Sequence, residues 1–251
     1  MNPLEIYKRL PGINCGKCTA KTCMAFAMKM AKNEVSLSEC IKITEQGKNE
    51  LEAMLSKADL SDWKDKFLKE LLSDMAKKDL ASVAEGIGAL TEGGILKIKY
   101  MGKDITVTNS GFNEELGIWD KLMVLMYVRN AGKAALTGKW VAFRDLKDGS
   151  LKSIGFKESC EAPLAKVFDA DQEGVIKRLL ANGAEKVSGF TTEHSYKVYP
   201  LPKIPFMILL WPAEEDFEPA CSILLDSTAA EFLDVEALLF LGQALVSRLK
   251  R

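Results

Sequence analysis

The residues of this chain that point most directly to chemistry are four cysteines near its beginning. Cys15, Cys18 and Cys23 lie within nine residues, and Cys40 follows after a gap the size of a helix. This C-x2-C-x4-C-x16-C spacing holds four thiols on short tethers. Four cysteine thiolates are the usual ligands of an iron–sulfur cluster. The spacing therefore predicts a metal centre with Cys15, Cys18, Cys23 and Cys40 as its ligands.

Zinc is the main alternative metal for such a group. Structural zinc sites with four cysteines usually combine two C-x2-C pairs separated by a longer gap. This chain has one such pair, Cys15 and Cys18, and Cys23 follows too soon to begin a second. The spacing favours a cluster with four irons over zinc, and ordinary buried thiols are a third interpretation.

The residues around the cysteines suit a negatively charged group. Cys23 is expected at the beginning of a helix, where N–H groups and the helix dipole favour anions. Lys17 and Lys21 add positive charge beside it. Gly16 has no side chain, so the backbone can pass close to a sulfide there.

The elements that position the cysteines are expected to be helices. Residues 4–10 form a short helix that Pro11 and Gly12 end. A loop over residues 13–21 carries the first two cysteines, and a helix follows to about residue 33, with a stripe of Met24, Ala27, Met28 and Ala31. A second loop, 34–39, leads to Cys40, and Leu51, Met54 and Leu55 share one face of a further helix. We expect residues 1–58 to be a small all-helical iron–sulfur module.

The rest of the chain, after a polar linker at residues 57–62, is expected to be a larger domain of residues 63–251. An amphipathic helix over 63–75 comes first, and then a hairpin over 93–108 that turns at Gly102-Lys103. Helices are expected at 119–131, closed by Gly132, at 174–180, and after Asp234. Strands are expected at 140–143, 197–199, 206–211 and 221–225. The strands come in groups, so the fold class is α+β.

Composition excludes several classes of function. The chain has 251 residues with 34 basic and 35 acidic side chains, so it lacks a basic nucleic-acid footprint. No stretch has the apolar length of a membrane span, and no signal peptide is visible. We therefore expect a cytoplasmic protein, in which clustered cysteines bind metal instead of forming disulfides.

At the cysteines the chain resembles a known family. Residues 4–11, 14–18 and 22–27, with Cys40, are similar to the iron–sulfur domain of the corrinoid iron–sulfur protein large subunit and of an electron-transport subunit of the Rnf complex. In that family the four cysteines bind one [4Fe-4S] cluster. Residues 205–215 and 223–229 look like an uncharacterised C-terminal domain of anaerobes that is often fused to such a module.

The resemblance implies a [4Fe-4S] protein in one-electron transfer, serving anaerobic or corrinoid-linked metabolism with a redox protein or a corrinoid protein as partner. The alternative is a corrinoid (cobalamin)-binding protein whose cluster reduces the bound cobalt. A third hypothesis is a cluster with a purely structural role. No catalytic triad, carboxylate pair or nucleotide loop is visible, so the sequence does not indicate an enzyme.

Four other residues or groups carry weaker signals. His194, the sole histidine, lies in a polar stretch and is expected to be exposed, without a role at a cofactor. Cys221 opens an apolar strand and is expected to be a small core residue, and Cys160 has no partner in sequence. Ser227 or Thr228 is expected to cap a following helix.

Overall fold

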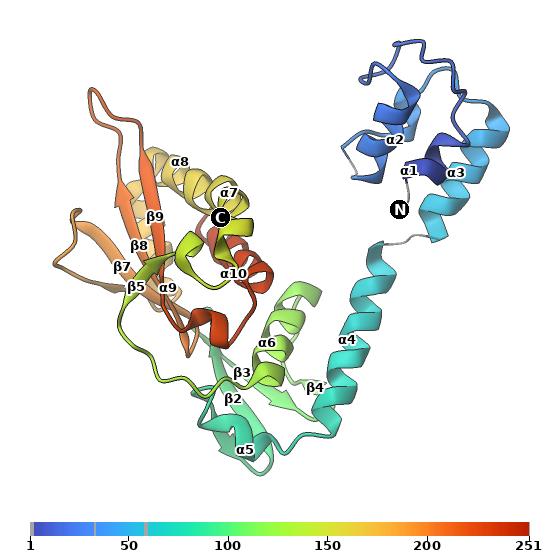
Figure 1. The fold of residues 1–251 in the computed structure, drawn as a ribbon. Helices are drawn as coiled ribbons and strands as arrows, with labels where there is room; N and C mark the ends of the chain where they lie inside the picture. Colours follow the sequence, from blue (N-terminus) through green and yellow to red (C-terminus); the bar gives the residue numbers. More distant parts are fainter. Residues whose placement is uncertain (1–2, 33, 58–59, 251) are drawn as a thin grey trace. The chain divides into compact units, whose positions relative to one another are not determined.

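The chain divides into two compact units, Met1–Lys66 and Phe67–Arg251. The computed structural model describes residues 3–32, 34–57 and 60–250, and Figure 1 traces the elements of each unit. Residues 58 and 59, within the expected linker, lie outside the described residues. The domain boundaries 1–58 and 63–251 stay a prediction.

The described residues of the first unit form helices and no strand. The elements are α1 (Pro3–Tyr7), α2 (Cys23–Ala31), the 3₁₀ turn η1 (Leu37–Glu39), α3 (Glu45–Lys57) and the beginning of α4 (Leu60–Ala76). Phe26, Ala27 and Met30 of α2 are buried with Ile6 of α1 and Leu51 of α3.

The buried stripe of α2 differs from the one expected from the sequence. Helix α2 buries Cys23, Phe26, Ala27 and Met30, which are spaced at i, i+3, i+4 and i+7. The expected stripe ran through Met28, which is 50% exposed. The stripe is rotated because the large Phe26 ring, fully buried, faces the core.

The second unit contains two antiparallel sheets, so the α+β class is confirmed. The smaller sheet has the order β1-β2-β3-β4 and the larger one β5-β9-β8-β7-β6. The strands are β1 (Leu90–Glu92), β2 (Ile95–Tyr100), β3 (Lys103–Thr108), β4 (Gly111–Phe112), β5 (Trp140–Ala142), β6 (Glu185–Lys186), β7 (His194–Leu201), β8 (Ile204–Trp211) and β9 (Ala220–Asp226).

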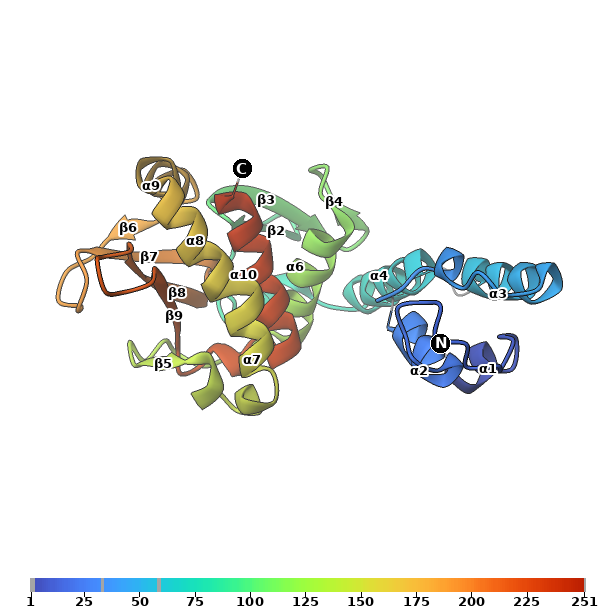
Figure 2. The same ribbon diagram turned by 90° about the horizontal axis from the view of Figure 1, so that it is seen from above.

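Helices cover these sheets. Figure 2 shows α8 and α10 side by side, and α8 contacts β8 and β9. The helices are α5 (Leu80–Ala84), α6 (Ile118–Asn130), α7 (Ser153–Phe156), the π-helix η4 (Lys157–Glu161), α8 (Ala162–Ala170), α9 (Gln172–Ala181) and α10 (Val235–Leu249), with 3₁₀ turns η2 (Phe143–Asp145), η3 (Gly149–Leu151) and η5 (Ala229–Glu231). Within the described ranges, no helix combines the length and apolar character that crossing a bilayer requires.

Strand β8 begins earlier than its sequence indicates. A proline removes a ladder donor, so the expected strand began after Pro205. The structure starts β8 at Ile204, because the pairing with β7 shifts register between Val198 and Leu201. Pro205 lies opposite this irregularity, where its missing N–H costs no regular ladder bond.

Helix α8 was not expected from the sequence, and it carries a proline, Pro163, near its beginning. The helical path runs through α7, η4 and α8, so Pro163 sits inside it. A proline normally breaks a helix at such a place. Here the preceding turn is widened, since the Ala162 N–H donates to the Lys157 carbonyl, five residues back. This π turn accommodates the proline, as such bulges often do at kinks.

Two turns also differ from expectation. The β2–β3 hairpin turns at Met101-Gly102, both with positive φ (48° and 76°), one residue before the expected position. Helix α6 is closed by Ala131 in the left-handed conformation. Gly132 serves close packing instead, because a Cβ there would lie 2.7 Å from the Phe232 ring.

The end of β9 is tied to residues 137 and 138 by a buried carboxylate. Asp226 is 1% exposed. It accepts hydrogen bonds from the Gly138 N–H (2.7 Å), the Thr137 N–H and hydroxyl, and the Thr228 N–H (3.1 Å) and hydroxyl (2.7 Å). The expected cap by Ser227 or Thr228 is therefore wrong, because the Thr228 hydroxyl donates to Asp226 and no side-chain cap bond begins η5.

Candidate metal centre

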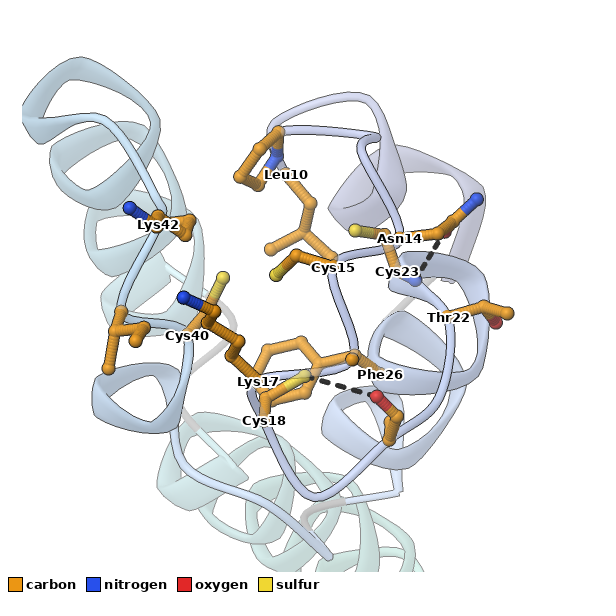
Figure 3. Close-up of a pocket in the computed structure, with 14 residues that line it drawn as sticks. Leu10, Asn14, Cys15, Lys17, Cys18, Thr22, Cys23, Phe26, Cys40 and Lys42 are labelled. Carbon is orange, nitrogen blue, oxygen red and sulfur yellow. Dashed lines mark hydrogen bonds between the residues drawn. The ribbon is translucent and has the colours of Figure 1, made fainter.

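The four cysteines predicted as ligands line one hollow of the first unit. Figure 3 shows their thiols around the space between the loop before α2 and the segment after η1. Cys15 and Cys18 come from that loop, Cys23 is the first residue of α2, and Cys40 follows η1. Leu10, Phe26 and Ile41 complete the wall with apolar side chains. The role of the four cysteines as metal ligands stays a prediction.

A side chain that the sequence analysis missed, Asn14, joins the loop to α2. Its Oδ1 accepts a hydrogen bond from the Cys23 N–H at 2.8 Å. Asn14 has φ +47° and Gly16 has φ +64°, so Cys15 stands between two left-handed residues. Asparagine and glycine tolerate this conformation best. A Cβ on Gly16 would meet nothing within 4 Å, so in this structure backbone conformation explains the glycine.

The N-terminus of α2 is capped by a side chain. The Thr22 hydroxyl accepts from the Ala25 N–H at 3.1 Å. Together with the bond from Cys23 to Asn14, this fixes the first turn of α2. The thiol of Cys23, which is 8% exposed, is thereby held at the positive end of the helix dipole.

A second tether joins the two cysteine-bearing segments. The Thr19 hydroxyl donates to Glu39 Oε2 at 2.7 Å, and the other oxygen of Glu39 accepts from the Ser36 N–H at 2.8 Å. These hydrogen bonds lower the pKa of the Glu39 carboxyl, and the bond from Thr19 has the largest effect. Ser36 and Glu39 form a capping box, and their S-x-x-E spacing was the sequence signal that could have revealed it. Cys40 is positioned directly after this box.

The environment of Cys40 disfavours four negatively charged thiolates close together without compensating positive charge. Burial raises the pKa of the Cys40 thiol, and the neighbouring Cys18, Cys23 and Cys15 thiols raise it further. Four thiolates therefore require positive charge among them. Lys17 and Lys42 line the hollow, whereas Lys21, expected beside it, is not among the lining residues.

The donor set fits an iron–sulfur cluster in its chemistry. Among the described residues, no three Cys, His, Asp or Glu side chains converge on a point suited to one metal ion. A single zinc ion with Zn–S bonds of about 2.3 Å would need its sulfurs about 3.8 Å apart. A cluster gives each thiolate an iron of its own.

The remaining candidate residues lie in the second unit. His194 is on β7 and packs edge-on against Phe168, with its side chain 18% exposed, so the expected exposure is wrong. Its Nδ1 is buried without a hydrogen-bond partner. Burial raises the pKa of the Cys160 thiol to about 11 and also raises the pKa of the Cys221 thiol. The negative charge of Glu161 raises both further. Both thiols are therefore protonated at neutral pH.

Two family models match separate parts of the chain. Residues 10–42, which contain all four cysteines, match the family model described as "Putative Fe-S cluster". Residues 79–248 match DUF3786, a domain of unknown function. The second match covers more than half of the chain, and the protein belongs to the DUF3786 family. No solved structure matches it.

The curated relatives match in the N-terminal region, and they confirm the family resemblance there. The gamma subunit of the acetyl-CoA decarbonylase/synthase complex of Methanothermobacter thermautotrophicus is 40% identical over 55 residues, 22% of this chain and 12% of that subunit. The corrinoid/iron-sulfur protein large subunit of Moorella thermoacetica is 46% identical over 50 residues, 20% of this chain and 11% of that subunit. The match thus spans about an eighth of these relatives.

Substitutions at Asn14 are expected to separate its hydrogen bond from its backbone conformation. Asn14→Gly keeps the left-handed backbone and loses the bond to Cys23, worth about 1 kcal/mol. Asn14→Ala adds about 1–2 kcal/mol of left-handed strain. We expect bound iron to be lost to a chelator fastest in Asn14→Ala, slower in Asn14→Gly and slowest in the unchanged protein. Equal rates in all three proteins, with Asn113→Gly as the control, would contradict this role of Asn14.

Proposed function

We propose that Cys15, Cys18, Cys23 and Cys40 bind one [4Fe-4S] cluster and that the protein transfers single electrons. The observation that carries the proposal is the arrangement of four thiols from two tethered segments around one hollow, inside the region matched as an iron–sulfur domain. When bound, such a cluster supplies a one-electron redox centre with a potential between about −700 and +450 mV.

The chain's own residues suit this role. The first turn of α2 places N–H groups near the thiols, and Lys17 and Lys42 bring positive charge to the rim. Both features favour negative charge on the ligands. Leu10 and Phe26 limit the access of water, and lower solvent exposure is one of the factors that set a cluster's potential.

The names of the relatives point to corrinoid-linked metabolism, which we propose as the setting for this protein. The partner would be a redox protein or a corrinoid protein. Three cavities of the second unit have volumes of about 410, 550 and 620 Å³, which suit small ligands. We propose that the corrinoid is carried by a partner.

The test is anaerobic reconstitution of the whole chain with iron and sulfide. We expect about four irons per chain and an EPR signal that appears on reduction and disappears on reoxidation. Protein that binds no iron would overturn the proposal. Bound iron without a reversible couple would overturn electron transfer and favour a structural cluster. Co-elution of added cobalamin on gel filtration would overturn the assignment of the corrinoid to a partner.

A further inference from the structure

The second unit contains a polar cavity of about 550 Å³. Its walls come from the turn between β2 and β3, the beginning of α6, the end of α9 and the last turns of α10. These segments are far apart in sequence, so the cavity exists only in the folded unit. Its volume is within the range of about 300–1,000 Å³ that small-molecule sites have.

Three side chains in the wall form one connected network. The Tyr100 hydroxyl donates to Asp120 Oδ1 at 2.6 Å, and Arg248 Nη2 donates to the same oxygen at 2.9 Å. The Arg248 guanidinium also lies over the Tyr100 ring, 5.5 Å from its centroid. Burial and the Asp120 charge raise the pKa of Tyr100 strongly, so its hydroxyl remains a donor to Asp120.

The network holds Arg248 in one orientation with donors to spare. Arg248 Nη1 donates to the Ala244 carbonyl at 3.0 Å. The hydrogen bonds described for Arg248 thus occupy two of the five N–H groups of a guanidinium. Its side chain is 30% exposed and that of Asp120 is 21% exposed, so the pair is open to the cavity. A fixed, partly exposed guanidinium is suited to bidentate binding of a carboxylate or phosphate.

The other polar groups of the cavity define the ligand further. Lys103 supplies a second cation, and Asn182 and Ser247 supply neutral hydrogen-bonding groups. Asp120 is engaged by Tyr100 and Arg248, whereas Glu115 is an exposed carboxylate in the wall. Glu115 opposes a highly charged anion and can accept from a donor on the ligand.

We propose that this cavity binds a small polar metabolite through an oxyanion group, a carboxylate or a phosphate, held by Arg248 and Lys103. The remainder of the ligand carries a hydrogen-bond donor that faces Glu115. The proposed ligand site does not depend on the cluster, so its test is independent of the test of electron transfer.

The test is isothermal titration of the full chain with succinate and with inorganic phosphate, and with chloride at matched ionic strength. We expect saturable binding of at least one oxyanion and none of chloride. Binding of succinate alone assigns a carboxylate, and binding of phosphate alone assigns a phosphate. Absence of binding beyond the chloride control overturns the proposal.

Variants then locate the binding. Arg248→Lys keeps the charge and loses the planar fork, and Lys103→Ala removes the second cation. Each is expected to weaken binding about tenfold, corresponding to about 1.4 kcal/mol. Lys99→Ala is the control, since Lys99 pairs with Asp104 and is not among the lining residues. If Arg248→Lys does not fold, Lys103→Ala decides. Equal affinity in Lys103→Ala and Lys99→Ala would overturn the assignment.

Discussion

Cys23→Ser is expected to remove nearly all cluster iron from the anaerobically reconstituted protein. A serine hydroxyl stays protonated at neutral pH and is a poor substitute for a thiolate, the form in which cysteine binds metal. Cys23 is also buried at the first position of α2, so a water molecule or a surface side chain does not readily take its place. Iron and sulfide analysis after gel filtration measures the loss.

Cys221→Ser is the matched control for this experiment. It makes the same chemical change on β9 in the second unit, at a cysteine outside the proposed ligand set. We expect it to retain about four irons per chain. Full iron content in Cys23→Ser, or loss of iron in Cys221→Ser, would show that the wrong cysteines have been assigned. Circular dichroism of both variants checks that the helices are retained.

Asp226→Ala is expected to lower the free energy of unfolding of the second unit by about 3 kcal/mol. The substitution leaves the N–H groups of Thr137, Gly138 and Thr228 without their acceptor, and an unsatisfied buried donor costs about 1–3 kcal/mol. Relaxation and water reduce the sum of these costs. Asp148→Asn, an exposed change in the same unit, should alter stability by less than about 0.5 kcal/mol. Urea unfolding followed by tryptophan fluorescence measures both.

The Asp226 carboxylate is also expected to make the free energy of unfolding depend on pH. Burial alone would raise the pKa of Asp226, but hydrogen bonds from Thr228, Thr137 and Gly138 outweigh it and hold the pKa below 3.8. A lowered folded pKa stabilises the fold above the unfolded value. That contribution is lost as pH falls through the folded pKa.

Asp226→Asn removes this titration. Its stability relative to the unchanged protein should therefore improve as the pH falls below about 4. A constant difference between the two proteins from neutral to acid pH would contradict the lowered pKa.

Local features of the fold could be predicted from sequence because they depend on neighbouring residues. Asp234 caps α10 through a bond from the Ala237 N–H, and alternating residues predict the β2–β3 hairpin. The errors occurred where distant packing overrides local preference. Ala131, and not Gly132, adopts the left-handed conformation that closes α6, while Gly132 packs against Phe232.

The sequence alone determined the set of four cysteines, their spacing and the helix start at Cys23, because ligand type and tether length are local properties. Only the tertiary structure decided that Asn14 bonds to Cys23 and that Thr19 bonds to Glu39. It likewise brought Arg248 to Asp120, 128 residues earlier in the chain. These long-range contacts depend on how helices and sheets bury their apolar faces against one another. Local sequence patterns do not predict which faces pack together.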